Sequence, residues 1–338
     1  MYTLGGKWRH GGELWTNWCE GFLPGMMWIF AEQTGDDAWA ELAERYSRPL
    51  EERKHDRNVH DLNFVLGSSY GRWYHLTGDR ALLEVIITAG KTMGLRFRER
   101  GQYLRSFMAE DSLFIDIMMN VGILFWAAEA SGDADLRRRV DAHCLTTRRT
   151  LVRGDGSTSH EGIFDLETGE FLRQTTQQGY RGDSCWVRGL AWSLYGFGTA
   201  YRYTTTPAYL QTAELNAQCF IEHLPANGIT PYDFDAPDDE RPLDTSGSAI
   251  AASGLLQLAE LTASPERAEG YRKCALRMLD SLCAPPYLAS GTPGWEGILK
   301  EQVYHLHKDL GVSESCMFGE YFFVEAMQQA LNLLAAAD

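Results

Sequence analysis

The sequence predicts an all-α protein folded as an (α/α)6 barrel, in which a ring of inner helices lies inside a layer of outer helices. Two observations predict this fold. Helix-length segments rich in aromatic and small residues recur along the chain, and after most of them comes a turn and then a more charged amphipathic segment. The 338 residues, of which 44% are hydrophobic, can bury a large core, and we expect one domain spanning residues 1–338.

Six segments have the character of inner helices, because they mix aromatic with Gly, Ala and Ser residues and carry few charges. They begin near Gly21, Gly67, Met118, Arg188, Ala249 and Gly319. Five of them end in similar turn signals, which are Thr34-Gly-Asp, Thr77-Gly-Asp, Ser131-Gly-Asp, Thr204-Thr-Thr-Pro and Thr262-Ala-Ser-Pro. Glycine commonly ends a helix, and Asp or a Ser-Pro or Thr-Pro step commonly starts the next one.

The segments after these turns space apolar residues by three and four, as outer helices do. The expected outer helices are Asp37–Glu52, Arg80–Phe97, Ala134–Leu151, Pro207–Leu224 and Pro265–Leu282. Strand-like alternation is scarce, and only Gly162–Arg173 predicts a hairpin. Because no repeat is a polar cap, six pairs favour a closed ring over an open solenoid. Long loops between the pairs predict a functional site at one mouth of the ring.

Composition and charge exclude several classes of function. The formal net charge is −15, which argues against docking on nucleic acid or on an anionic membrane. The longest apolar stretch, Leu113–Ala128, is interrupted by Asp116 and Asn120 and is too short to span a bilayer. The N-terminus shows no signal peptide, and the seven cysteines have no C-x-x-C spacing. We therefore expect a cytoplasmic protein.

No cofactor or metal is expected. His305-x-His307 lacks the partners of a zinc site, and the paired glycines near Gly154 and Gly196 lack the setting of a nucleotide-binding loop. Gly67-Ser-Ser-Tyr-Gly71 matches G-x-S-x-G, but no strand precedes it.

Asp116 is the most informative polar residue. It lies among Leu, Phe, Ile and Met side chains, with Asn120 one helical turn later. Burial raises the pKa of a carboxyl, and a raised pKa suits a general acid near neutral pH. A buried Asp paired with an Arg is an equally good reading of this pattern.

Other candidates have structural alternatives that the sequence leaves open. Asp61 could be the N-cap of the second inner helix, or it could converge with Asp116 at one end of the ring. Asp183 is expected to be an N-cap. Arg188 could bind an anionic substrate at the mouth, or form a salt bridge with Asp183 or Glu161. Several of the ten Trp residues could stack on sugar rings.

In combination, seven motifs resemble those of the unsaturated glucuronyl hydrolases, glycoside hydrolase family 88, from about Trp18 to Glu325. They are Trp18-x-x-Gly-Phe22 with Gly25-Met-Met-Trp28, His60-Asp-Leu62 with Tyr70-Gly-Arg72, Ile115-Asp-Ile-Met-Met-Asn120, Gly156-Ser-Thr-x-His160, Gln178-Gly-Tyr180, Asp183-Ser-x-Trp-x-Arg-Gly-x-Ala-Trp192 and Gly319-Glu-Tyr-Phe-Phe-x-Glu-Ala326. Members of that family are (α/α)6 barrels.

The resemblance implies roles for particular residues. It makes Asp116 the general acid/base and Asp61 the second essential carboxylate. The substrate-binding residues that it implies are Trp18, His60, His160, Gln178, Arg188 and Trp192, with Phe107 in place of an aromatic that is often Trp, and Ser313 and Ser315 near the substrate carboxylate. The sequence departs from the family pattern at Leu190, where members usually have Gln, and at Leu23-Pro24, which replace a step that contains an aromatic residue. These departures concern which sugars the subsites prefer more than the reaction itself.

The family chemistry starts from a 4,5-unsaturated uronic acid at the non-reducing end of an oligosaccharide. Protonated Asp116 would deliver a proton to C4 of the vinyl ether, water would add at C5, and the resulting hemiketal would open and release the sugar. Ionised Asp61 would stabilise the developing positive charge. An unsaturated rhamnogalacturonyl hydrolase acting on pectin fragments, a sugar 2-epimerase with a histidine pair, and a non-catalytic sugar-binding barrel remain alternatives.

Overall fold

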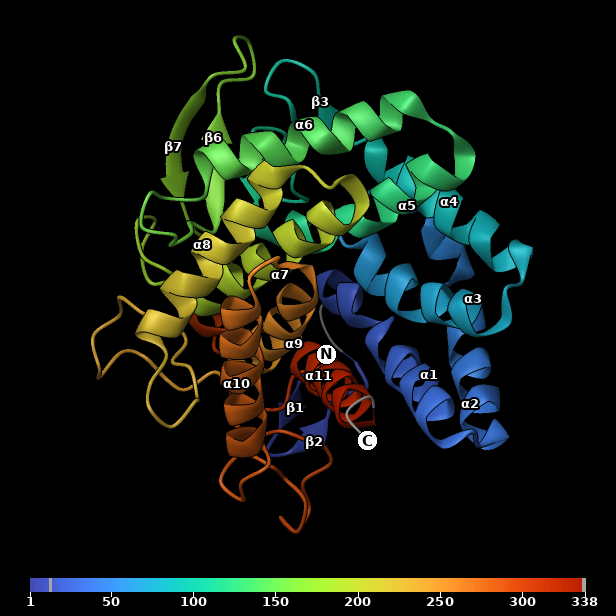
Figure 1. The fold of residues 1–338 in the computed structure, drawn as a ribbon, viewed down its shortest axis with the longest axis vertical. Helices are drawn as coiled ribbons and strands as arrows, with labels where there is room; N and C mark the ends of the chain where they lie inside the picture. Colours follow the sequence, from blue (N-terminus) through green and yellow to red (C-terminus); the bar gives the residue numbers. More distant parts are fainter. Residues whose placement is uncertain (12–13, 336–338) are drawn as a thin grey trace.

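A computed structural model describes residues 1–11 and 14–335, and it shows the (α/α)6 toroid that the repeats predict (Figure 1). The inner ring consists of α1 (Phe22–Thr34), a π-helix (Asn63–Gly71) that continues into α3 (Arg72–Thr77), α5 (Val121–Ser131), α7 (Val187–Thr204), α9 (Thr245–Leu261) and α11 (Met317–Ala335). Each inner helix contacts the next, and α11 contacts α1, so the ring is closed.

The outer layer contains the five helices expected from the amphipathic segments. They are α2 (Asp37–Ser47), α4 (Arg80–Gly94), α6 (Ala134–Thr150), α8 (Pro207–His223) and α10 (Pro265–Leu282). The helix expected to reach Glu52 ends at Ser47, because the chain tightens into a 3-10 helix (Arg48–His55) that has a proline in its first turn. The sixth pair is incomplete, since no outer helix follows α11 in the chain described up to residue 335.

Three of the predicted turns are built as the sequence indicates. Before each of α2, α4 and α6, a glycine has a left-handed backbone and the following Asp side chain accepts a helical N–H. These pairs are Gly35 and Asp36, Gly78 and Asp79, and Gly132 and Asp133. Local chemistry therefore determines where these outer helices begin.

The predicted hairpin is confirmed as β6 (Glu161–Phe164) and β7 (Phe171–Thr175). The structure also contains short strands that the sequence did not predict. Six of these strands form three two-stranded sheets, which are β1 (Thr3–Leu4) with β2 (Lys7–Trp8), β3 (Phe97–Arg98) with β4 (Tyr103–Leu104), and β8 (Gln302–His305) with β9 (Leu310–Glu314). The seventh, β5 (Ser112–Phe114), joins the edge of the β6–β7 hairpin. Strands of two to five residues are too short for alternation to be visible in the sequence.

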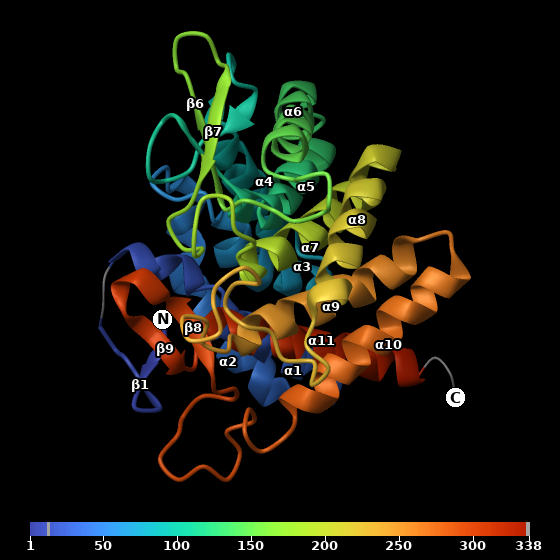
Figure 2. The same cartoon turned by 90° about the vertical axis from the view of Figure 1, so that its left-hand side faces the viewer.

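Labelled strands β1, β6, β7, β8 and β9 lie toward one end of the barrel, as Figure 2 shows, while the ends of the outer helices project at the other. β5 pairs antiparallel with β6, and the Ile115 N–H donates to the His160 carbonyl. This pairing brings the segment that carries Asp116 beside His160. Among the described residues, no helix is long and apolar enough to cross a membrane.

Candidate active site

A cavity of about 240 Å³ lies where the loops enter the inner helices. Most of its lining residues come just before an inner helix or from β5, β8 and the loops beside them. The lining residues are Trp18, His60, Asp61, Phe107, Met108, Phe114, Asp116, Gln177, Gln178, Tyr304, His305 and Lys308. The two predicted carboxylates therefore share one cavity, although they are 55 residues apart in the chain.

Asp61 directs its side chain into the cavity and does not cap the helix that follows it. The Asn120 Oδ1 accepts the N–H groups of Asn63 and Phe64 at 3.0 and 3.2 Å, and so caps this helix from another segment. The Asn120 Nδ2 donates to Asp61 Oδ1 at 3.4 Å. The N-cap interpretation of Asp61 is therefore wrong.

The pKa values of the two carboxyls are shifted in opposite directions. Burial, and secondarily the charge of Asp116, raise the pKa of Asp61 well above its usual range. Burial also raises the pKa of Asp116, but contact with His160 and the nearby His60 and Arg188 outweigh it, and the pKa of Asp116 is lowered. The expectation of a raised pKa at Asp116 is wrong for the free protein, and no Arg side chain forms a salt bridge with it among the described residues.

Each carboxylate faces a histidine whose tautomer is determined by a backbone donor. The Phe107 N–H donates to His60 Nδ1, and the Gln177 N–H donates to His160 Nδ1, both at 3.0 Å. A neutral imidazole that accepts at Nδ1 carries its proton on Nε2. His60 Nε2 lies 3.3 Å from Asp61 Oδ1, and His160 Nε2 lies 3.4 Å from Asp116 Oδ2.

His60 is neutral at ordinary pH, because burial, followed by the charge of Arg96, lowers its pKa to about 3. Both histidines thus carry the N–H on the nitrogen nearest a carboxylate oxygen, within ion-pair distance but without hydrogen-bond geometry, and have no free acceptor nitrogen facing the cavity. This arrangement orients the two carboxyls and does not provide an imidazole base.

Arg188 lies behind the cavity wall and is 2% exposed. It pairs with buried Asp244 at 3.1 Å, and also donates to the carbonyls of Val303 and Tyr304. Its Nη2 donates to the Gln178 Oε1 at 2.6 Å. Because the Gln178 carbonyl is held in this way, its amide NH2 is the group left to donate to a ligand.

Comparison with known proteins decides the family. The profile of Glycosyl Hydrolase Family 88 matches residues 7–283. The chain belongs to this family. It is therefore a glycoside hydrolase, in agreement with the resemblance of its motifs.

Solved structures and curated relatives agree with this assignment. The chain is 32% identical over 327 residues to an unsaturated glucuronyl hydrolase of Formosa agariphila, covering 94% of this chain and 81% of the relative. A crystal structure of an unsaturated glucuronyl hydrolase specific for heparin matches with a TM-score of 0.89 and 30% identity, over 94% of this chain and 86% of that one. The corresponding enzyme of Bacillus sp. GL1 matches with a TM-score of 0.88 and 30% identity, over 93% and 86%.

The aromatic residues implied by family 88 divide between the cavity and the core. Trp18 lines the cavity, donates from Nε1 to the Tyr304 hydroxyl at 2.7 Å, and stacks on Phe318. Phe107 lines it too and is 37% exposed. Trp192, by contrast, is 1% exposed and packs against Phe64, so the structure places it beneath the cavity.

Other family-implied positions also lie away from the cavity. Ser313 is exposed on β9 and does not line it. Ser315 is buried, where its hydroxyl accepts from Trp295 Nε1 and donates to the Leu299 carbonyl. Asp183 is exposed and pairs with Arg181, so it is not the expected N-cap. Leu190 is buried in the core of this family 88 barrel.

Sequence reasoning missed half of the lining residues. They are Met108, Phe114, Gln177, Tyr304, His305 and Lys308. Asp244, the partner of Arg188, was missed as well, since Asp183 and Glu161 were the expected partners. Of these residues, only Gln177 could have been suspected from the sequence, because it is adjacent to Gln178. The others reach the cavity from β5, β8 and loops, which have no periodicity that marks them in the sequence.

Proposed function

We propose that this enzyme removes the 4,5-unsaturated uronic acid from the non-reducing end of lyase-generated oligosaccharides by hydrating its vinyl ether. The names of the relatives support this substrate class, since they are unsaturated glucuronyl and unsaturated chondroitin disaccharide hydrolases. The observation that carries the proposal is that buried Asp61 and partly buried Asp116 share one cavity, the first with a raised pKa and the second with a lowered pKa. Such a pair holds a single proton over the range between its two apparent pKa values.

In the free enzyme that proton resides on Asp61. The uronate carboxylate of an entering substrate adds negative charge and displaces water, and both effects raise the pKa of Asp116. The proton can then pass to Asp116, which delivers it to C4, while ionised Asp61 stabilises the positive charge that develops at C5. The His160 Nε2–H, 3.4 Å from Asp116 Oδ2, stabilises the carboxylate that remains after the transfer.

Hydration then completes the reaction without a protein nucleophile. Water forms a bond to C5 and gives a proton to one of the two carboxylates, which restores the single proton of the pair. The product is a hemiketal at C5, and its opening breaks the bond between C5 and the ring oxygen and leaves a ketone at C5 and a hemiacetal at C1. Collapse of this hemiacetal to an aldehyde breaks the bond between C1 and the oxygen of the leaving sugar, which takes up the hemiacetal proton. The distance rule for the paired carboxylates of ordinary glycosidases does not apply to this route.

Gln178 is our candidate for binding the uronate carboxylate, because Arg188 holds its carbonyl and leaves its NH2 as the donor. In this proposal Arg188 is a positioning residue that acts through Gln178, not the direct anion ligand expected from the sequence.

The two histidines argue against the epimerase alternative. His60 and His160 both accept a hydrogen bond at Nδ1 and carry their proton at Nε2, so neither presents a basic nitrogen to a substrate.

The test uses a panel of unsaturated disaccharides and the ultraviolet absorbance of their double bond. We expect the absorbance to fall, and we expect a saturated glucuronide of the same linkage to be inert because it has no vinyl ether. In heavy water, freshly released keto acid should carry one deuteron at C4. Cleavage of the saturated substrate, or product without early C4 deuterium, would contradict hydration and return both aspartates to ordinary glycosidase roles.

A further inference from the structure

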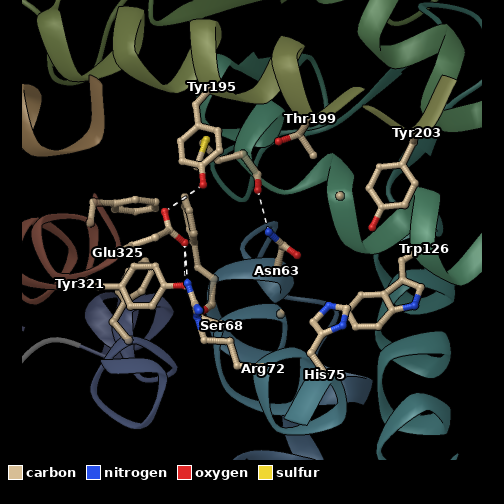
Figure 3. Close-up of a pocket in the computed structure, with 16 residues that line it drawn as sticks. Asn63, Ser68, Arg72, His75, Trp126, Tyr195, Thr199, Tyr203, Tyr321 and Glu325 are labelled. Atoms are coloured by element: carbon tan, nitrogen blue, oxygen red, sulfur yellow. Dashed lines mark hydrogen bonds and ion pairs between the residues drawn. The ribbon is translucent and has the colours of Figure 1, made fainter. Parts of the chain in front are cut away.

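A second cavity, of about 300 Å³, lies on the axis of the barrel. Its walls come mainly from α1, the π-helix with α3, α5, α7 and α11, and Figure 3 shows the side chains that line it, whereas the active-site cavity is lined mainly by loops and short strands. The lining residues with polar or aromatic side chains are Asn63, Ser68, Arg72, His75, Trp126, Tyr195, Thr199, Tyr203, Tyr321 and Glu325, together with Phe22, Phe64 and Phe322. His75 is exposed, so the cavity reaches solvent at the end of the barrel away from the active site.

An aromatic layer separates the two cavities. Phe22, Phe64 and Phe322 line the axial cavity, and Trp192 packs on Phe64 and Phe322 with ring centroids 5.2 Å apart. Trp18, which lines the active site, lies on the other side of Phe64 at 5.4 Å. A ligand in the axial cavity would therefore not contact Asp61 or Asp116.

The charges at the axial cavity cancel. Arg72 Nη2 pairs with Glu325 Oε1 at 2.7 Å, and Tyr195 and Ser253 donate to Glu325 Oε2. Burial, followed by the charge of Arg72, lowers the pKa of His75, so this ring is neutral near pH 7. The lining thus favours neither an anion nor a cation.

Three polar groups retain unused hydrogen-bonding capacity. Among the described residues, none forms a hydrogen bond with the Tyr203 hydroxyl or with Asn63 Oδ1. Burial raises the pKa of Tyr203 to about 12, so its hydroxyl stays protonated. The Thr199 hydroxyl accepts from Gln257 Nε2 at 3.0 Å and keeps its proton for another acceptor. The cavity therefore offers two donors and an amide acceptor.

Aromatic rings complete the lining. His75 and Trp126 form a stacked pair with ring centroids 4.9 Å apart, and Tyr203 lies beside Trp126 (Figure 3). Aromatic faces pack well against the C–H surfaces of a ligand whose hydroxyls are bonded elsewhere. The volume is at the lower end of the range of small-molecule sites, about 300–1,000 Å³, and suits about one sugar ring.

We infer that the axial cavity is a second binding site, and that its ligand is a neutral monosaccharide. A lining whose one ion pair cancels in charge, a mixture of donors and an acceptor, and aromatic walls all match a hydroxyl-rich ring without a carboxylate. The inference does not rest on the proposed hydrolysis, because the aromatic layer separates the site from the two carboxyls.

The test measures binding of glucose and N-acetylglucosamine to the whole protein by titration calorimetry, with glucuronate as the charged comparison. We expect saturable binding of at least one neutral sugar, and weaker binding of glucuronate. Thr199→Val and Tyr203→Phe each remove one hydroxyl, and each should weaken neutral-sugar binding by about 2- to 10-fold. Thr199→Ser keeps the hydroxyl and should bind like the wild type.

Tyr74→Phe is a matched control for the loss of a tyrosine hydroxyl, since Tyr74 packs against Trp126 but does not line the cavity. It should leave sugar binding unchanged, and all variants should keep their melting temperatures within a few degrees. Thr199→Val also removes the acceptor of the Gln257 Nε2 bond, and Tyr203→Phe, which leaves that bond intact, keeps the test decisive. Absence of saturable binding by the wild type, or equal affinity of Thr199→Ser, Thr199→Val and Tyr203→Phe, would overturn the inference.

Discussion

Replacing Asp61 by Asn tests how the two active-site carboxyls share one proton. Asp61 holds that proton in the free enzyme, because burial and the charge of Asp116 raise its pKa. In the variant, Asp116 must take the proton from solvent, although its pKa lies below the ordinary value of 3.8. At pH 6 a carboxyl with such a pKa is protonated in fewer than about one molecule in 150.

We therefore expect Asp61→Asn to lower kcat/KM at pH 6 by about 100-fold or more. The value for the variant should rise about tenfold for each unit by which the pH is lowered toward 4, because protonated Asp116 becomes more common. In the wild type, kcat/KM should instead fall as pH rises through the raised pKa of the pair. Initial rates of double-bond loss, at substrate concentrations well below KM, measure these profiles.

Asp183→Asn provides the matched control, since Asp183 is an exposed aspartate that pairs with Arg181 outside the cavity. Its profile should match that of the wild type. Circular dichroism establishes that Asp61→Asn is folded. A folded Asp61→Asn enzyme with the wild-type pH profile, or with a rate at pH 6 within about threefold of it, would refute the proton assignment.

Three further predictions concern other polar groups of the chain. Asp116→Asn should keep the fold and lower kcat by about 10²–10⁴-fold, measured by the same absorbance assay, because an amide cannot protonate C4. Arg188→Leu should raise KM and lower the free energy of unfolding by about 3–5 kcal/mol, since it leaves Asp244 buried without its cation. Gln178→Ala should raise KM but leave the free energy of unfolding, measured by urea titration, close to that of the wild type. Burial raises the pKa of Glu320 to about 8, so the folded state keeps a proton that the unfolded state releases near 4.5. The free energy of unfolding should fall between these pH values, and Glu320→Gln should flatten that dependence in urea titrations.

The repeating architecture could be predicted from the amino-acid sequence, because its signals are local. Each Thr-Gly-Asp or Ser-Gly-Asp turn contains both the glycine that ends one helix and the Asp that caps the next, and the apolar spacing within each outer helix fixes which face is buried. Motif order along the chain was also enough to indicate the family and the two aspartates Asp61 and Asp116.

How these residues act depends on contacts between segments that are far apart in the chain. Asn120 caps the helix after Asp61 from 57 residues away, which leaves the Asp61 side chain to face the cavity. The N–H groups that set the tautomers of His60 and His160 come from Phe107 and Gln177. A pKa depends on burial and on distances to charges through space, and a hydrogen bond depends on the alignment of segments that are remote in the chain. For this reason the sequence did not predict that the pKa of Asp61 is higher than that of Asp116, or that Asp244 is the partner of Arg188.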